Sequence, residues 1–384
     1  MKIVIPKERR AHEARVAASP DTVKKLIGLG QEVSIEKGAG EASSITDQAF
    51  IDAGAKIVDD VKALYADAEV VLKIQRPMMK DEGFDELALM KSGTILCASM
   101  MALTNKPLVE ACAKAGLTVF AMELVPRITR AQSMDILSSQ SNLGGYRAVI
   151  DGAAEFGRAF PMMMTAAGTI PPAKVLVLGA GVAGLQAIAT AKRLGAIVFG
   201  YDVRAAAKEQ VESLGGKFVM VDESAMKEAQ TSGGYAKEMS EEYKQKQAQI
   251  LADTVKKVDM VICTALIPGK PAPRLVNEEM VKSMKTGSVI VDMASEMGGN
   301  CELTEHGKIV TKHGVKMVSY QNIPSRISVD ASQLFAKNYL NFLTPLVDKE
   351  TKAVKVNRED DVIKGSLVAI GGEVVHPALV EGGK

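Results

Sequence analysis

The chain has 384 residues, of which 47% are hydrophobic and 24% are charged, and its formal net charge is +1. This length predicts two or three domains, and the composition is that of a globular protein with a sizeable core. The near-neutral charge argues against a nucleic-acid partner, and no uninterrupted apolar stretch is long enough to predict a membrane span. The four cysteines have no metal-binding spacing, so we expect reduced thiols and no metal site.

Short strands alternate with helices over residues 1–125. The pair Ser19-Pro20 predicts a helix start, because serine caps helix N-termini and proline suits the first turn. Strands are expected at 2–5, 32–35, 56–58, 69–72, 94–97 and 117–121, and helices at 20–29, 47–53, 61–66, 84–90 and 107–115. Such alternation is typical of a parallel sheet covered by helices.

Residues 126–160 are mixed and mostly helical, and we interpret them as the connection to a second domain. Buried strands of that domain are expected at 174–178, 197–201, 260–264, 288–293 and 315–318. A helix over 326–345 and a Gly-rich tail, interpreted as a hairpin, follow them. The predicted fold class is α/β, with two Rossmann-like, doubly wound domains and a cleft between them. The predicted domains are 1–137 with 327–384, and 138–326.

The most informative motif is the glycine run that follows the strand at 174–178. Gly179 would allow the tight turn, Gly181 would let the backbone approach a pyrophosphate, and Gly184 would let the helix pack against the strand. Free N–H groups at the start of that helix would face the phosphates. Asp202 lies 18 residues after Gly184, where a carboxylate can accept ribose hydroxyls and repel a 2′-phosphate. The pattern predicts NAD(H) rather than NADP(H).

A long, charged and helix-prone segment, 222–259, separates two strands of the second domain. Ser232, Gly233 and Gly234 interrupt it just before Tyr235. Two interpretations stay open. One is a solvated helical hairpin, and the other is a mobile flap that closes over the cofactor, with glycine hinges and Tyr235 as its latch.

A dense set of polar residues precedes the glycine-rich domain. Within sixteen residues the chain holds Arg127, Arg130, Gln132, Asp135, Ser138, Ser139, Gln140, Ser141 and Asn142. A ligand site between two α/β domains would use such residues, with Arg127 pairing Asp135 and Gln132 binding a carboxamide. A hydrophilic linker with helix-capping serines would explain the same composition.

Three long runs of residues, together with GGYAKEM, resemble one enzyme family over essentially the whole chain. The runs are RAQSMDILSSQSNLGGYRAVIDGA, AAGTIPPAKVLVLGAGVAGLQAIATAKRLGA and TALIPGKPAP. They are similar to the NAD(H)-binding component of the proton-translocating NAD(P) transhydrogenase family. The resemblance implies direct hydride transfer from NADH to NADP⁺, of the Si-specific type, coupled to proton translocation across the membrane.

The same resemblance implies partners and a location. NAD(H) would bind to this chain directly, and NADP(H) would be bound by a partner component. The chain would form a homodimer and assemble with a proton-conducting membrane subunit. It would be cytoplasmic and lie on the cytoplasmic face of the inner membrane through those partners, with no role for nucleic acid.

The resemblance also implies functional residues. Residues with a catalytic role would be Arg127, Gln132, Asp135, Ser138 and Tyr235, the first four of them around the nicotinamide and its ribose. Further cofactor contacts would come from the glycine run, the end of the next strand and the second half of the domain. They are Ala180, Gly181, Val182, Asp202, Val203, Arg204, Gly234, Gln247 and Leu266.

Alanine dehydrogenase shares this fold and is the main alternative. Arg15 and Lys73 match the residues with which that family grips pyruvate. However, no histidine occurs between Cys97 and Asn105, where its proton-transfer residue would lie, and Glu296 stands where an aspartate is expected. Carbonyl reduction needs a positioned acid, whereas hydride exchange between two nicotinamides moves no proton at the reacting carbons. A non-catalytic NAD-sensing module is the second alternative.

Overall fold

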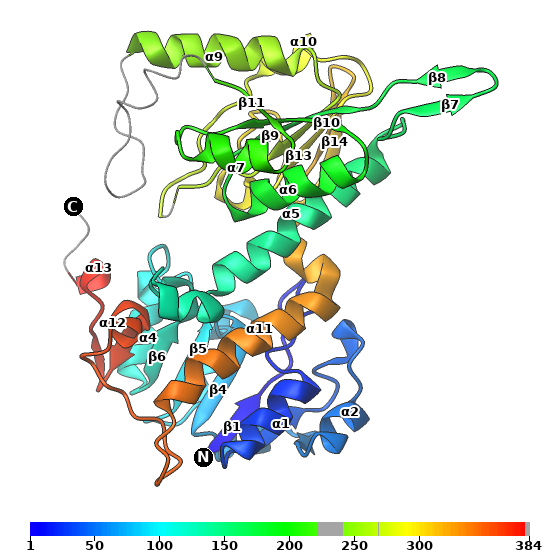
Figure 1. Cartoon of the computed structure of the whole chain (residues 1–384). Coiled ribbons are helices and arrows are strands. Elements are labelled where there is room, and N and C mark those ends of the chain that lie inside the picture. The colour runs from blue at the N-terminus through cyan, green and yellow to red at the C-terminus, as the bar shows by residue number, and fades with distance from the viewer. Residues whose placement is uncertain (221–240, 268, 381–384) are drawn as a thin grey trace. The chain divides into compact units, whose positions relative to one another are not determined.

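The computed structural model describes residues 1–220, 241–267 and 269–380. The chain divides into two compact units, shown in Figure 1. Unit 1 comprises Met1–Gln140 and Ser325–Lys384, and unit 2 comprises Ser141–Pro324. Unit 1 is therefore built from both ends of the chain, and unit 2 from its middle.

Unit 1 contains an eight-stranded sheet in the order β17-β16-β6-β5-β4-β1-β2-β3. The parallel strands are β1 (Lys2–Ile5), β2 (Glu32–Glu36), β3 (Lys56–Val58), β4 (Val70–Gln75), β5 (Ile95–Ser99) and β6 (Thr118–Ala121). The antiparallel strands β16 (Leu367–Ile370) and β17 (Glu373–Val374) form the hairpin expected in the tail. Most of the central strands are buried, as in parallel sheets covered on both faces.

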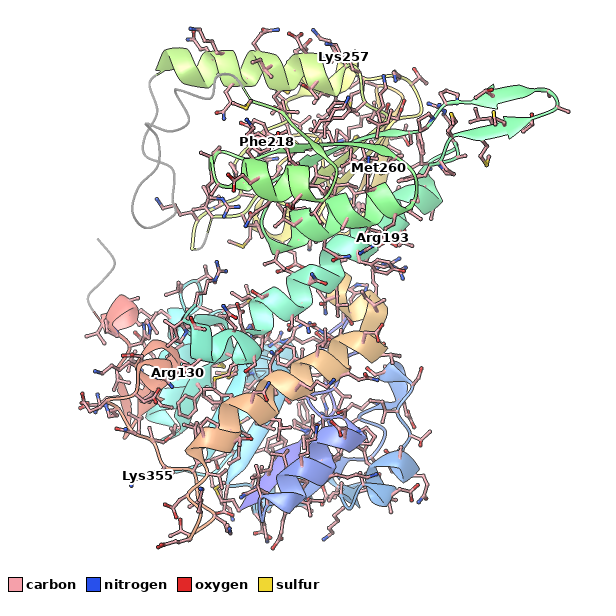
Figure 2. The ribbon with its side chains drawn as sticks, in the orientation of Figure 1. Arg130, Arg193, Phe218, Lys257, Met260 and Lys355 are labelled. Carbon is pink, nitrogen blue, oxygen red and sulfur yellow. The ribbon has the colours of Figure 1, made fainter. Side chains whose placement is uncertain are left out.

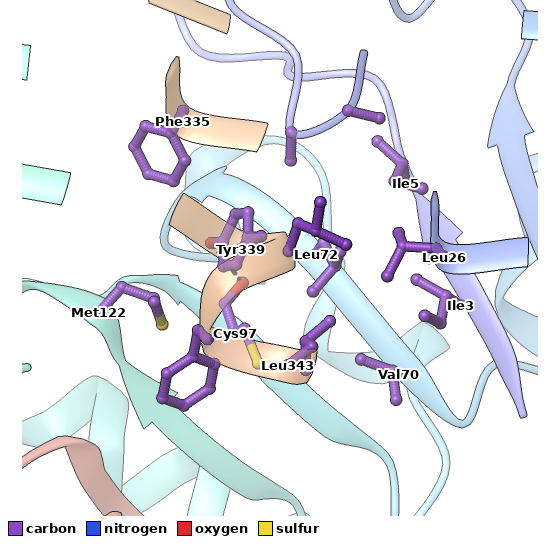
Figure 3. Close-up of a cluster of buried hydrophobic side chains, with 14 of the residues drawn as sticks. Ile3, Ile5, Leu26, Val70, Leu72, Cys97, Met122, Phe335, Tyr339 and Leu343 are labelled. Atoms are coloured by element: carbon purple, nitrogen blue, oxygen red, sulfur yellow. Dashed lines mark hydrogen bonds between the residues drawn. The ribbon is translucent and has the colours of Figure 1, made fainter. Parts of the chain in front are cut away.

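Helices cover both faces of this sheet. One face packs against α1 (Pro20–Gly28), α2 (Asp47–Asp52), α11 (Ser328–Leu343) and α12 (Asp361–Ser366), and the other against α3 (Val61–Ala66), α4 (Lys106–Lys114) and α13 (Pro377–Val380). Ser19 caps α1 by accepting the Thr22 N–H, as its position before Pro20 predicts. Tyr339 of α11 donates to the carbonyls of Lys73 and Cys97 and lies among the apolar side chains of Figure 3. Helix α11, from the C-terminal part of the chain, thus completes the core of the N-terminal strands.

Unit 2 contains a seven-stranded sheet in the order β11-β10-β9-β12-β13-β15-β14. The strands are β9 (Lys174–Leu178), β10 (Ile197–Tyr201), β11 (Lys217–Phe218), β12 (Met260–Cys263), β13 (Val289–Asp292), β14 (Ile309–Lys312) and β15 (Val315–Val318). Among the strand pairs described in this sheet, only β14–β15 is antiparallel.

Helices cover both faces of the second sheet as well (Figure 1). One face packs against α5 (Ile136–Glu155), α6 (Val182–Arg193) and α7 (Ala207–Ser213), and the other against α9 (Glu241–Val255) and α10 (Glu278–Ser283). The predicted α/β class, with two mainly parallel, helix-covered sheets, is confirmed.

Two local predictions differ from the structure. The helix expected at 84–90 is only a short 3₁₀ turn, Leu87–Leu89, because the Glu86 side chain is drawn inward to accept hydrogen bonds from Lys73 and the Met78 N–H. An unpredicted hairpin, β7 (Met163–Thr165) and β8 (Gly168–Ile170), projects from unit 2. Its residues are largely exposed, so it lacks the alternation of buried and exposed residues that marks a strand in sequence.

Candidate functional site

The candidate site of unit 2 lies where β9 ends. β9 pairs with β10 on one side and with β12 on the other, so the direction of chain progression across the sheet reverses at this strand. Ligands of open α/β sheets bind at such a point, beyond the carboxyl ends of the strands. The glycine run Gly179–Gly184 begins there.

Gly179, Gly181 and Gly184 differ in whether the fold requires a glycine at that position. Gly179 has φ +92°, and a Cβ on Gly184 would lie 1.8 Å from the Gly179 carbonyl oxygen, so the fold itself requires both. Gly181 has an ordinary φ of −78°, and a Cβ there would meet nothing within 4 Å. The space beside Gly181 therefore fits a group brought by a ligand.

The first turn of α6 faces the same space. Its N-cap is Gly181, which has no side chain to accept hydrogen bonds from the first N–H groups of the helix. Such groups are left for solvent or for a ligand, and the helix dipole favours an anion beside them. The local geometry thus fits a pyrophosphate.

Asp202 lies at the end of β10 and is only 8% exposed. Its carboxylate accepts the Ala180 N–H at 2.7 Å, and the backbone N–H and guanidinium of Arg204 at 2.9 Å. These contacts use the main acceptor positions of the carboxylate. A ribose would have to share them or displace Arg204, whose side chain is 41% exposed.

Exposed apolar side chains follow the ends of three neighbouring strands of the unit 2 sheet. Val182, Val203, Leu266 and Ile267 follow the ends of β9, β10 and β12, and each is more than 40% exposed. Thr264, which sequence reasoning missed, donates its hydroxyl to the carbonyls of Leu178 and Gly179 and so joins the β12 loop to the glycine turn. Its position as the last residue of the expected strand 260–264 is the only sequence signal. Exposed apolar residues at the carboxyl ends of neighbouring strands are typical of a ligand site.

Most of the predicted polar set, from Arg127 to Gln140, lies in unit 1, and Ser141 and Asn142 begin unit 2. Arg127 and Gln132 are exposed, and Gln132 belongs to a 3₁₀ turn, Thr129–Met134. Asp135 accepts the Ser138 N–H at 3.0 Å and its hydroxyl at 2.6 Å, so these two residues meet at the start of α5. Arg130 pairs with Asp360 on the surface. These residues thus combine helix capping with exposed groups that can bind a ligand.

Two other predictions concern unit 2. Gln247 lies in α9 and is partly exposed. Gly234 and Tyr235, with the proposed hinge and latch, lie outside the described residues.

In unit 1, charged residues lie near the end of the central strand β1, whereas in unit 2 the glycine run follows the central strand β9. Glu8, which follows β1, accepts from Lys73 at 3.2 Å, and Glu86 accepts from the same ammonium at 2.9 Å. All three side chains are at most 3% exposed. Burial raises the pKa of Glu8 despite the nearby cation. Burial opposes the charge on Lys73 as well, but the two carboxylates outweigh it and raise the pKa of the ammonium.

Arg15 is engaged in a similar way. It donates to Glu13 and to Gln140, at 2.7 to 2.8 Å. Burial alone would raise the pKa of Glu13, but the hydrogen bonds and charge of Arg15 lower it to about 2. Both cations that match alanine dehydrogenase therefore lie in buried ion pairs.

Unit 2 also has a hollow away from the glycine run. A hollow of about 550 Å³, lined in part by Phe160, Pro161 and Leu194, lies beside Arg193 at the far end of α6 from the glycine run (Figure 2). In the portion of the chain that the structure describes, no three His, Cys, Asp or Glu side chains could hold a metal ion. None of the helices described in the three ranges above is long and apolar enough to cross a membrane.

Comparisons with known proteins identify the family of this chain. The N-terminal domain of the alanine dehydrogenase/PNT family matches residues 4–144, and its C-terminal domain matches residues 148–377. The first part of NAD(P) transhydrogenase subunit alpha from Rhodospirillum rubrum is 64% identical over 379 residues, which cover 99% of each chain. The chain belongs to the NAD(P) transhydrogenase alpha-subunit family.

Solved structures give the same relationship within this wider family. The crystal structure of transhydrogenase from Sinorhizobium meliloti is 48% identical with a TM-score of 0.85, and the match covers 98% of this chain and 100% of that one. A structure of L-alanine dehydrogenase is 28% identical with a TM-score of 0.80, covering 99% and 98%. The predicted transhydrogenase resemblance is confirmed, and alanine dehydrogenase is the more distant relative.

Proposed function

We propose that this chain binds NAD(H) at the carboxyl edge of the unit 2 sheet and passes hydride from NADH to NADP⁺ on a partner component, coupled to proton translocation. Support comes first from Gly181, whose side of the turn is open and whose helix presents uncapped N–H groups to a phosphate. Membership of the transhydrogenase family supports the reaction class.

The proposed contacts divide by the portion of the dinucleotide they would bind. Gly181, Val182 and Ala180 would hold the pyrophosphate, and Asp202, Val203 and Arg204 would hold the adenosine ribose. Leu266 and Gln247 would line the adenine side. Gly234 and Tyr235 remain in the proposal, as residues of a loop that closes over the site.

The nicotinamide end needs groups that orient the ring. We assign this role to Arg127, Gln132, Asp135 and Ser138. The Asp135–Ser138 hydrogen bond fixes one side of this set, while Arg127 and Gln132 are exposed. The dihydronicotinamide supplies the hydride, and these residues would position it and keep water away.

The proposed assembly follows the family. The chain would act as a homodimer with an NADP(H)-binding component and a proton-conducting membrane subunit, on the cytoplasmic face of the inner membrane. Support comes from the name of the Rhodospirillum rubrum relative, which denotes the first part of a subunit alpha and so implies further subunits.

The test is an exchange assay with NADH, an oxidised NADP analogue, this chain and a purified NADP(H)-binding component. We expect reduction of the analogue only when both proteins are present. Reductive amination of pyruvate at a normal dehydrogenase rate would favour alanine dehydrogenase, and NADH binding without transfer to the analogue would favour a sensing module.

Gln132→Asn tests the orientation of the ring. Shortening the amide by one methylene should slow hydride transfer roughly tenfold to a hundredfold while the NADH dissociation constant changes little, because the transfer depends on alignment. Gln48→Asn, at an exposed glutamine of α2, is the matched control. An unchanged transfer rate in Gln132→Asn would make Gln132 only a surface residue.

A further inference from the structure

Asn300 is fully buried, at 0% exposure, although its side chain is a primary amide. It lies beyond β13, after two glycines with positive φ, Gly298 and Gly299. A buried amide is costly unless its donors and acceptor are all used. Its partners therefore show what it does for the fold.

Among the described residues, the partners of the Asn300 side chain are backbone groups at the two ends of one loop, Ala265–Pro273. The amide nitrogen donates to the carbonyls of Ala265, at 2.8 Å, and Pro273, at 2.9 Å. The amide oxygen accepts the Ala265 N–H at 3.0 Å. One side chain thus joins the two ends of the loop. The two carbonyls can be satisfied only by the nitrogen, so the orientation of the amide is fixed by its partners.

The backbone beside Asn300 adds to this connection. The Asn300 carbonyl accepts the N–H groups of Leu275 and Val276, at 2.9 and 3.0 Å. Asp292, which is also fully buried, accepts the N–H groups of Ala294 and Cys301 and so holds the segment that carries Asn300. The loop after β12 is therefore supported by a rigid neighbour.

The supported loop reaches the proposed dinucleotide site. Ala265 lies against the glycine turn, since a Cβ on Gly179 would be 3.0 Å from the Ala265 nitrogen. The next two residues, Leu266 and Ile267, are 54% and 43% exposed. Burying large apolar side chains is favourable. A loop that is free to move would therefore relax and bury them, whereas a fixed backbone keeps them exposed.

We propose that Asn300 is a positioning residue for NAD(H) binding, which fixes both ends of loop Ala265–Pro273 and holds Leu266 in place for the nucleotide. The inference rests on the proposed function, because it assumes that Leu266 lines the bound dinucleotide. A loop ordered during folding does not need to be ordered again on binding, so the affinity rises.

Asn300→Asp tests this role with almost no change in shape. The carboxylate can still accept the Ala265 N–H, but it cannot donate to the carbonyls of Ala265 and Pro273. We expect the NADH dissociation constant, measured by the fluorescence of bound NADH, to rise about tenfold or more. Asn277→Ala, which removes the N-cap of α10 in the same unit, is the control for lost stability and should leave the constant unchanged.

A double-mutant cycle with Leu266→Ala separates positioning from general stability. If Asn300 acts through Leu266, Asn300→Asp should weaken binding much less once Leu266 is already truncated. Hydrogen exchange should rise in the peptide that spans 264–276 and not across unit 2. Should Asn300→Asp fail to fold, Asn300→Ala, which introduces no buried charge, takes its place in the same measurements.

The outcomes separate this inference from the proposed function. Wild-type protein that does not bind NADH overturns both. Wild-type binding with an unchanged dissociation constant in the Asn300 variants overturns only the inference, as does a fully additive cycle with Leu266→Ala. A local rise in exchange with weaker, non-additive binding supports it.

Discussion

Each unit has a central strand at the same position in its sheet, but the residues that follow this strand differ between the two units. In unit 1, β1 lies between β2 and β4, and in unit 2, β9 lies between β10 and β12. After β9 comes a glycine run beside open space. After β1 comes Glu8, which accepts the N–H of Ile74 at 2.7 Å and the ammonium of Lys73.

This difference shows that strand order alone does not decide whether the carboxyl end of the central strand stays open. Both switch points have the same strand arrangement, and the residues after the first strand decide whether the position stays open. Glutamate and lysine fill it with an internal ion pair in unit 1, whereas glycine leaves backbone N–H groups accessible in unit 2. We therefore expect changes in the ion pairs to affect stability, and changes in the glycine run to affect binding.

Lys73→Met should give the largest effect. It leaves the buried carboxylates of Glu8 and Glu86 without a cation, which should lower the free energy of unfolding by about 3–5 kcal/mol. NADH affinity of the folded variant should not change. Urea unfolding and NADH titration measure the two effects. Lys2→Met, which breaks the exposed pair with Asp67, is the control, and equal losses in both variants would contradict the account.

The Glu13–Arg15 pair should make the free energy of unfolding depend on pH in the acid range. The pKa of Glu13 is about 2 in the folded protein, against an ordinary value of 4.5. A lowered carboxyl pKa stabilises the fold above about pH 4.5, by about 3 kcal/mol, and this contribution is lost as the pH falls towards 2. Glu13→Gln should thus be less stable than wild type at pH 7, with a difference that narrows below pH 4.5 in urea unfolding. If the free energies of unfolding of Glu13→Gln and wild type changed with pH in parallel, the Glu13–Arg15 pair would not set the pH dependence of stability.

Gly181→Ala and Gly184→Ala should separate binding from folding. The Gly181 change places a methyl group in open space, so the melting temperature should hold while NADH binds roughly tenfold to a hundredfold more weakly. The Gly184 change forces a methyl group onto the Gly179 carbonyl and should destabilise unit 2. NADH titration and thermal melting distinguish the two, and unchanged affinity in Gly181→Ala would exclude this turn as the pyrophosphate site.

Asp202→Ala should have a smaller effect, about a tenfold weaker NADH affinity, because the ribose loses an acceptor and the Ala180 N–H loses its partner. Asp202→Asn, which keeps one acceptor oxygen and removes the negative charge, should also bind NADPH better than wild type does. Titration of both dinucleotides against the three proteins provides the measurement. If all three proteins bound each dinucleotide with the same affinity, Asp202 would not select between NADH and NADPH.

Sequence predicted the features of this molecule that depend on local pattern. The Ser19 cap, the buried strands and the strand–glycine–helix order of 174–193 are short-range features, and each is present. Glu86 shows the limit, because a long-range ion pair with Lys73 replaces the helix that its neighbours favour. The exposed β7–β8 hairpin has no buried face to leave a pattern.

The site could be predicted only where the motif is contiguous. Gly181 and Asp202 belong to one strand–helix–strand sequence, so their spacing indicates a dinucleotide. Asn300 lies 35 positions from Ala265, and nothing in that spacing indicates that its amide holds the loop. The Arg204 contacts of Asp202 could not be foreseen either, since they depend on a side-chain conformation.

Direct hydride transfer is the central claim, and an isotope experiment tests it most directly. NADH deuterated at C4 on one face, and then on the other, is mixed with this chain, the NADP(H)-binding component and NADP⁺ in ordinary water. The account predicts that one of the two labelled forms passes its deuterium to NADPH without dilution by solvent hydrogen, as mass spectrometry would show. NADPH that carries no deuterium from either form would contradict it.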